Sequence, residues 1–98
     1  MNFDWDPEKS EANLADRGFD FDFATLIFDG LVLEVEDRRR DYGEVRFVAI
    51  GLAEGIALTV VYTDRPDPAG GVIRRVISAR RSNRHERKAY EAAIQEES

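Results

Sequence analysis

One uninterrupted β-branched segment constrains the fold more than any other part of the chain. Residues 56–63 read Ile-Ala-Leu-Thr-Val-Val-Tyr-Thr, with no charged side chain among them. Such a run is typical of a central strand that is covered on both faces. Residues 64–71 contain two prolines and two glycines and predict a turn, and residues 72–79 predict the partner strand of a hairpin. The chain is therefore expected to build a sheet around this pair.

Helix signals come before the strands. Asp6 followed by Pro7 predicts a helix start, with Asp6 as the N-cap, and Gly18 predicts its end. Asp20 predicts the cap of a second helix, which the Asp29-Gly30 pair ends after apolar residues at helical spacing. Two amphipathic helices are expected before the sheet begins.

Two further strands and a last helix complete the expected fold. Alternation of apolar and polar residues predicts strands over 31–36 and 45–50, separated by a polar loop at 37–43, and residues 3–5 are compatible with a short leading strand. Asn83 and Glu86 form a capping-box pattern at the start of a helix that runs towards Ala93. We predict one α+β domain over residues 1–98: an antiparallel β-sheet meander with two N-terminal helices and one C-terminal helix, all on one side.

Composition excludes several classes of site. The chain has no cysteine and a single histidine, His85, which excludes disulfides, Cys-based zinc sites and His-rich metal sites. It also has no Walker loop and no Gly-x-Gly-x-x-Gly segment. No apolar run approaches the roughly 20 residues that span a bilayer, and the start does not resemble a signal peptide. We expect a cytoplasmic protein with no metal, no cofactor and no membrane partner.

Charge is distributed unevenly along the chain. The net charge is −6, yet residues 72–90 hold seven basic residues, six of them arginine, against the single acid Glu86. Arginine favours planar, bidentate contacts with phosphate or carboxylate groups. Nucleic acid and an acidic protein segment, which could be the chain's own acidic N-terminal part, are therefore both candidate partners, and a merely solvated basic face remains the third interpretation.

The strongest anion site is expected where the last strand passes into the last helix. Arg80, Arg81 and Arg84 lie beside a helix N-terminus, which attracts phosphate through its free N–H groups. Antiparallel pairing could also bring Arg65 close to Arg74 and Arg75. Metal-free RNA cleavage needs such cations on the phosphate, together with groups that accept and donate a proton. Candidates for that acid–base role are Glu44, Asp64, Glu86, Tyr62, Tyr90 and His85.

Several segments together resemble one family. Phe3-Asp4-Trp5-Asp6-Pro7 opens the chain, Gly43-Glu44-Val45-Arg46-Phe47 lies in its middle, and Ser78-Ala79-Arg80-Arg81 precedes Glu86-Arg87 and Tyr90-Glu91. In order and spacing these segments are similar to the BrnT toxins. The family commonly has Lys-His-Gly after the first helix, where this chain has Asp16-Arg17-Gly18. Arg17 can fill the ordinary role of a cation near a helix C-terminus.

The resemblance implies both fold and function. It implies a RelE-like fold, a ribonuclease toxin of a type II toxin–antitoxin system that inhibits translation, and a BrnA-like ribbon-helix-helix antitoxin whose complex with the toxin binds operator DNA. It places the family's basic site on Arg65, Arg80 and Arg81, with Arg74, Arg75 and Arg84 as further RNA-binding residues. The alternative is a non-catalytic interaction module, or degenerate toxin, that acts only as a co-repressor.

Overall fold

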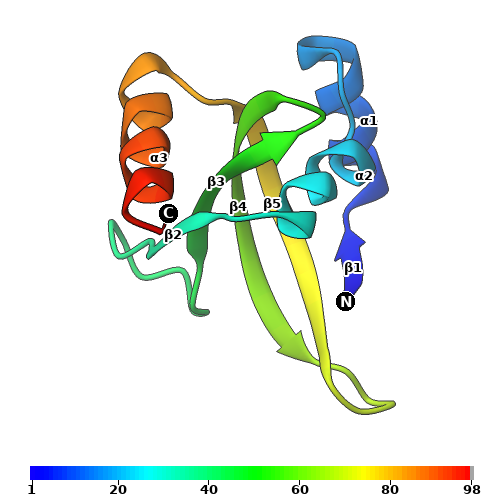
Figure 1. Ribbon diagram of the computed structural model, residues 1–98. Helices are drawn as coiled ribbons and strands as arrows, with labels where there is room; N and C mark the ends of the chain where they lie inside the picture. Colours follow the sequence, from blue (N-terminus) through cyan, green and yellow to red (C-terminus); the bar gives the residue numbers. More distant parts are fainter. Residues whose placement is uncertain (98) are drawn as a thin grey trace.

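The computed structural model describes residues 1–97, which form an α+β architecture (Figure 1). A central sheet carries helices on both sides, and the α+β prediction is confirmed. The elements in chain order are β1 (Asn2–Trp5), α1 (Pro7–Arg17), α2 (Phe21–Ala24), the 3₁₀ helix η1 (Thr25–Asp29), β2 (Leu33–Glu36), β3 (Phe47–Ala53), β4 (Ile56–Pro66), β5 (Val72–Arg81) and α3 (Arg84–Glu97).

The sheet is mixed rather than purely antiparallel. Its strand order is β1-β5-β4-β3-β2, and each strand from β2 to β5 is antiparallel to the next. The leading strand β1 instead pairs in parallel with the outer edge of β5, where Trp5 lies opposite Val76. A parallel pair requires a long crossover, which the whole segment from α1 to β4 supplies. The prediction of an antiparallel sheet is therefore corrected at this edge.

Side-chain alternation along the central strands divides the sheet into two faces. Leu58, Val60 and Tyr62 point to one of them, termed here the core face, where they join a single buried cluster with Phe21 of α2 and Ile27 of η1. The large apolar side chains of α2 and η1 thus cover the core face.

The opposite face, termed the groove face, carries Thr59, Val61 and Thr63 of β4. Helix α3 lies on this side: Figure 1 shows it across the sheet from α1 and α2, and Glu86 near its start bonds to Arg80. The prediction that all helices cover one side is wrong, because this ion pair and the capping box beside it hold the start of α3 against the groove face.

One β-bulge interrupts the pairing of β4 with β5. Val61 lies opposite Ser78, but the next residue, Tyr62, lies opposite Val76, so that Ile77 has no partner in the register. An extra residue in one strand reverses the faces to which the following side chains point. Because of this bulge, Arg75 and Arg80 both point to the groove face although they are five positions apart, a spacing that places residues of a regular strand on opposite faces.

The predicted caps are confirmed, and two boundaries are corrected. Asp6 caps α1 by accepting from the N–H of Glu8, Gly18 ends it in the left-handed conformation, and Asp20 caps α2. After Ala24 the backbone tightens into the 3₁₀ helix η1, so the second helix is not α-helical throughout. Strand β4 continues to Pro66, into the segment predicted as a turn, because Asp64 pairs in register with Arg74 and the two form an ion pair of 2.9 Å.

Gly51 marks the closest approach of η1 to the sheet and yields a stability prediction. A Cβ atom at Gly51 would lie 2.9 Å from the Cβ of Ile27 and 3.0 Å from Cγ1 of Val32. We expect Gly51→Ala to destabilise the fold by about 1–3 kcal/mol, because overpacking a core costs that much. Thermal denaturation followed by circular dichroism would measure the loss. Gly30→Ala is the matched control, since its Cβ would meet nothing within 4 Å, and an equal effect of both variants would contradict the account.

Candidate functional site

An open groove crosses the groove face between the start of α3 and the loop that follows β2. We call it the sheet groove, and its volume is about 400 Å³. Its floor consists of small and apolar side chains, and its rim consists of charged ones. The lining residues are Val35, Glu36, Asp37, Arg38, Arg39, Val48, Val61, Ser78, Arg80 and Glu86.

Arg80 and Glu86 form the most closely organised pair in the groove. Arg80 donates from Nη1 to Oε1 of Glu86 at 2.7 Å and from Nη2 to Oε2 at 2.8 Å. Glu86 also accepts from the backbone N–H of Asn83, whose side chain caps the N–H of Glu86 in return, so the predicted capping box is present. The bonds from Arg80 lower the pKa of Glu86 to about 2. A helix start thereby fixes a guanidinium group at the groove.

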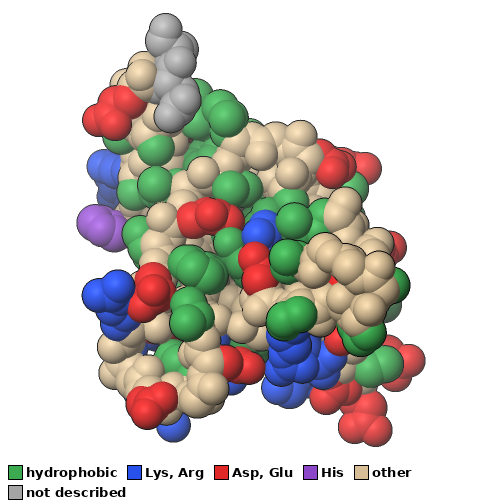
Figure 2. Space-filling view, turned by 90° about the horizontal axis from the view of Figure 1, so that it is seen from below, with side chains coloured by type: hydrophobic (Ala, Val, Ile, Leu, Met, Phe, Trp, Pro, Cys, Tyr) green, Lys and Arg blue, Asp and Glu red, His purple; other side chains and the backbone are tan. Residues whose placement is uncertain are grey.

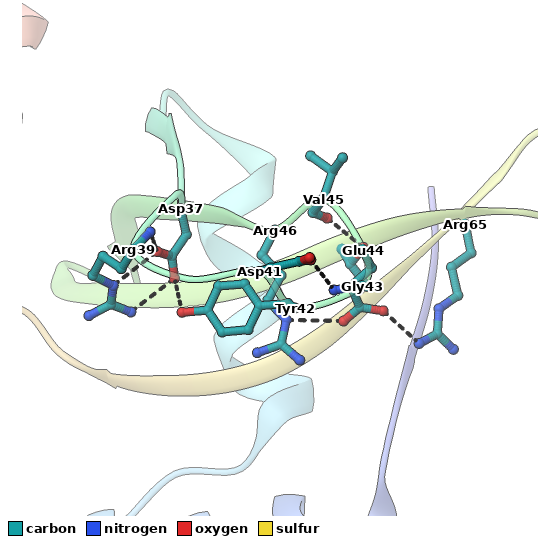
Figure 3. A network of polar contacts seen from close by, with 10 residues as sticks. Asp37, Arg39, Asp41, Tyr42, Gly43, Glu44, Val45, Arg46 and Arg65 are labelled. Carbon is teal, nitrogen blue, oxygen red and sulfur yellow. Dashed lines mark hydrogen bonds and ion pairs between the residues drawn. The ribbon is translucent and has the colours of Figure 1, made fainter.

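A second groove arginine, Arg39, is fixed by the loop that follows β2, where Figure 3 shows it against Asp37. Arg39 donates from Nε and Nη2 to the carboxylate of Asp37, both at 2.9 Å, and Tyr42 donates its hydroxyl to the same carboxylate. These bonds, first that of Arg39, hold the pKa of Asp37 far below its usual range. The hydrogen bond to Glu86 raises the pKa of Arg80, and the positive charge of Arg39 opposes this rise. Two oriented guanidinium groups therefore line one groove.

Arg74 and Arg81 lie on the core face, away from the groove. Arg81 lines a separate pocket with Leu14 and Phe19, and Arg74 packs its guanidinium 4.1 Å from the ring centre of Tyr62. Alternation places neighbouring strand residues on opposite faces. The expectation that Arg80 and Arg81 converge on one phosphate is therefore wrong.

Arg65 and Arg75 lie on the groove face but beyond the groove, near the end of β1. Arg65 bonds to Glu44 at 3.2 Å, and Arg75 bonds to Asp4 at 2.7 Å. The interpretation that the chain's own acidic N-terminal part binds arginines of residues 72–90 therefore holds for Arg75, whose partner is Asp4. Arg84 and His85 are exposed at the start of α3 and are not among the groove-lining residues.

A family model described as the ribonuclease toxin BrnT of type II toxin–antitoxin systems matches residues 5–86. The chain belongs to the BrnT family. The match covers every strand of the sheet at least in part, together with α1, α2 and the Arg80–Glu86 pair. No curated protein matches the chain.

The two tyrosines proposed for acid–base chemistry occupy structural positions in this BrnT chain. Tyr62 is 2% exposed on the core face and donates its hydroxyl to Glu34; burial raises the pKa of Tyr62 above its usual range. Tyr90 of α3 is buried and donates its hydroxyl to the carbonyl oxygen of Leu31 at 2.8 Å. Neither tyrosine lines the groove. Of the acid–base candidates taken from the sequence, Glu86 does, and the groove also contains the carboxylates of Glu36 and Asp37.

Arg17, at the end of α1, makes two hydrogen bonds that explain its role. It donates to the side-chain oxygen of Asn13 at 3.0 Å and to the carbonyl oxygen of Ala79 at 2.9 Å. Arg17 therefore ties the end of α1 to β5, close to Arg80 along the chain. This is a positioning role that does not require a titrating side chain.

The sequence-based interpretation missed the arginines of the loop after β2. Arg38, Arg39 and Arg40 are consecutive, but the charge of this region cancels in a regional sum. The signal was the acids that flank these arginines, Glu36 and Asp37 before them and Asp41 after them, because such neighbours form local ion pairs. On the face that Figure 2 shows, basic side chains likewise lie next to acidic ones rather than forming a continuous basic surface.

Within residues 1–97, no three His, Cys, Asp or Glu side chains are grouped closely enough to hold a metal ion. No helix in this range is long and apolar enough to cross a membrane.

The Arg80–Glu86 pair predicts a specific dependence on pH. Its contribution to stability is present above the ordinary glutamate pKa of 4.5 and is lost as pH falls towards about 2. We expect the carboxyl carbon of Glu86 to titrate near pH 2 in NMR spectra, and Arg80→Gln to move the midpoint back towards 4.5. A midpoint near 4.5 in the unmodified chain would contradict the pairing.

Proposed function

We propose that this BrnT chain is an endoribonuclease that binds RNA in the sheet groove and cleaves it without a metal ion. The family match over residues 5–86 is the observation that carries this proposal. The groove supports it, because Arg39 and Arg80 present oriented guanidinium groups in one groove. A phosphate between them would gain bidentate, charge-assisted hydrogen bonds.

The reaction that suits this arrangement is attack of the RNA 2′-oxygen on the adjacent phosphorus. The new bond closes a 2′,3′-cyclic phosphate while the bond to the 5′-oxygen breaks. The proton of the 2′-hydroxyl passes to a base, and the 5′-oxygen receives a proton from an acid or from water. Arg39 and Arg80 stabilise the negative charge that develops on the phosphate oxygens. Positioning and electrostatics thus supply most of the acceleration.

The resting ion pair provides a route to the base. Glu86 paired with Arg80 has a pKa of about 2 and is a poor proton acceptor at neutral pH. When a phosphate takes over bonds from Arg80, Glu86 loses the contact that depresses its pKa and gains a neighbouring negative charge, and both changes raise that pKa. Substrate binding therefore converts Glu86 into a stronger base beside the 2′-hydroxyl.

The biological setting follows from the same family. The toxin would act in the cytoplasm, inhibit translation by cutting RNA and share the RelE-like fold. Its antitoxin would be a BrnA-like protein with a ribbon-helix-helix domain, and the complex would bind its own operator. Inhibition would occur by occlusion of the sheet groove. A complex that leaves Arg80 open to solvent and phosphate would exclude this mode of inhibition.

A second candidate function is a non-catalytic module that acts as a co-repressor through its antitoxin. One observation favours it: each groove arginine is paired with a carboxylate, Arg38 with Glu36, Arg39 with Asp37 and Arg80 with Glu86. RNA must exchange or share these contacts before it binds. The side chains of Arg38, Arg39 and Arg80 are 80%, 77% and 46% exposed, so a phosphate can reach each guanidinium group. Absence of RNA cleavage at low salt would favour this module.

Arg80→Gln and Arg81→Gln form a matched pair for testing the catalytic proposal. We expect Arg80→Gln to reduce the cleavage rate by about 100-fold or more, as the loss of one donor to a developing oxyanion does. Arg81→Gln removes an equal charge from the core face and should retain at least half of the activity. Cleavage of labelled RNA by the purified chain, and growth arrest on its expression, measure the difference.

Folding controls complete this test. Arg80→Gln also removes a contact of the α3 start, so its thermal midpoint is measured beside that of Arg80→Lys. Lysine keeps the charge but lacks the planar, bidentate geometry, and we expect it to restore activity only in part. Equal losses in folded Arg80→Gln and Arg81→Gln would contradict the placement of the reaction in the sheet groove.

A further inference from the structure

A second basic cleft lies on the same side of the sheet, where β1 ends and α1 begins. Its volume is about 130 Å³. We call it the β1 cleft, and most of its lining side chains are charged. The lining residues are Asp6, Lys9, Glu44, Arg46, Arg65, Arg75, Val76 and Ile77. The basic members outnumber the acidic ones, in contrast to the sheet groove, where the two kinds balance.

Glu44 orients two of the cleft arginines. Its Oε2 accepts from Nε of Arg46 at 3.0 Å and its Oε1 accepts from Nη2 of Arg65 at 3.2 Å (Figure 3). The guanidinium of Arg46 also lies 4.1 Å from the ring centre of Tyr42. One carboxylate therefore holds two guanidinium groups side by side and neutralises only one of their charges. Each guanidinium retains N–H donors for a further acceptor.

Arg75 and Lys9 complete the cleft from other elements. Arg75 of β5 is held by Asp4 of β1 at 2.7 Å, and its side chain is 28% exposed. Lys9 belongs to α1 and is exposed. Side chains from three helices or strands and one loop thus meet at a single anion-attracting position. Glu44, which the sequence analysis gave as a candidate acid–base residue, instead forms ion pairs with both Arg46 and Arg65.

The β-bulge brings the β1 cleft and the sheet groove to one face. Without the unpaired Ile77, Arg75 and Arg80 would point to opposite faces of β5. They are five positions apart in the strand, which corresponds to about 16 Å. If a stacked RNA strand rises about as much per nucleotide as one strand of a DNA duplex, roughly 3.4 Å, about five nucleotides connect the two positions, and fewer do so in an extended strand.

We propose that the β1 cleft is a second RNA-phosphate subsite, which holds the substrate backbone several nucleotides from the phosphate that is cleaved. This inference rests on the proposed function and deepens it. The subsite binds without base recognition, because guanidinium and ammonium groups contact phosphate oxygens of any sequence. It provides local positive charge for RNA binding in a protein whose net charge is negative. It also makes the affinity depend on the length of the RNA. Arg65 therefore belongs to this subsite rather than to the cleavage position.

Binding of uncleavable RNA tests the subsite independently of catalysis. A twelve-nucleotide RNA with 2′-O-methyl groups throughout lacks the attacking hydroxyl, and a three-nucleotide version is too short to span both positions. We expect Lys9→Gln and Arg75→Gln each to weaken binding of the long RNA by about tenfold, the value of a lost charge-assisted contact. Binding of the short RNA should change less than twofold. Fluorescence anisotropy of labelled oligonucleotides measures both.

The salt dependence and a control variant sharpen the result. The slope of log affinity against log salt should fall by about 0.7 for each lost phosphate contact with single-stranded RNA. Lys88→Gln removes an exposed cation from α3, which is not among the cleft-lining residues, and should leave both affinities unchanged. The proposal is overturned if Lys9→Gln and Arg75→Gln bind the long RNA normally, or if Lys88→Gln weakens it equally. It is also overturned if the two cleft variants lose only binding of an acidic protein partner.

The outcomes separate this inference from the proposed function. Length-dependent binding that the cleft variants weaken as expected, together with no cleavage of unmodified RNA, would support the subsite and contradict the endoribonuclease proposal. Cleavage of unmodified RNA with no effect of the cleft variants on binding would support the endoribonuclease proposal and contradict the subsite.

Discussion

The pairing of β4 with β5 is the constraint on which the rest of the structure depends. Its register determines which arginines lie on the same face of the sheet. The bulge at Ile77 reverses the direction of the side chains that follow it in β5. Arg75, which precedes Ile77 in β5, and Arg80, which follows it, both point to the groove face. Their neighbours Arg74 and Arg81 point to the core face. A cluster that looks uniformly basic in sequence is therefore split into two sets with different surroundings. Only one set faces an open surface shared with α3.

Ion pairing governs the electrostatics of that surface. Carboxylates of the chain hold the groove arginines in place, and a chain with a net charge of −6 gains no long-range attraction for RNA. Binding then depends on short-range, oriented contacts that salt weakens. The same pairs couple the site to the fold, since Glu86 caps α3 while it holds Arg80, and Asp37 closes its loop while it holds Arg39. Under the proposed function, RNA binding and folding would depend on the same carboxylates.

Local signals in the sequence predicted local structure well. The caps at Asp6 and Gly18, the capping box at Asn83 and the β4–β5 hairpin all depend on residues close together in the chain, and the structure contains each of them. The parallel partner of β1 and the bulge at Ile77 arise from pairing between distant segments, which no short pattern encodes. For that reason Arg80 was placed correctly beside the start of α3, whereas the convergence of Arg81 with it was wrong. Arg39 was missed because nearby acids such as its partner Asp37 cancel its charge in the net charge of that region.

Arginine side-chain NMR in the presence of uncleavable RNA tests the central claim most directly. The Nε–H resonances of all arginines can be followed while a 2′-O-methyl oligonucleotide is added to the chain. The account predicts that resonances of Arg80, Arg39 and Arg75 shift in a saturable manner, while those of Arg81 and Arg74 stay in place. Shifts confined to Arg81 and Arg74, or no saturable shift in any arginine, would contradict the assignment of RNA binding to the groove face.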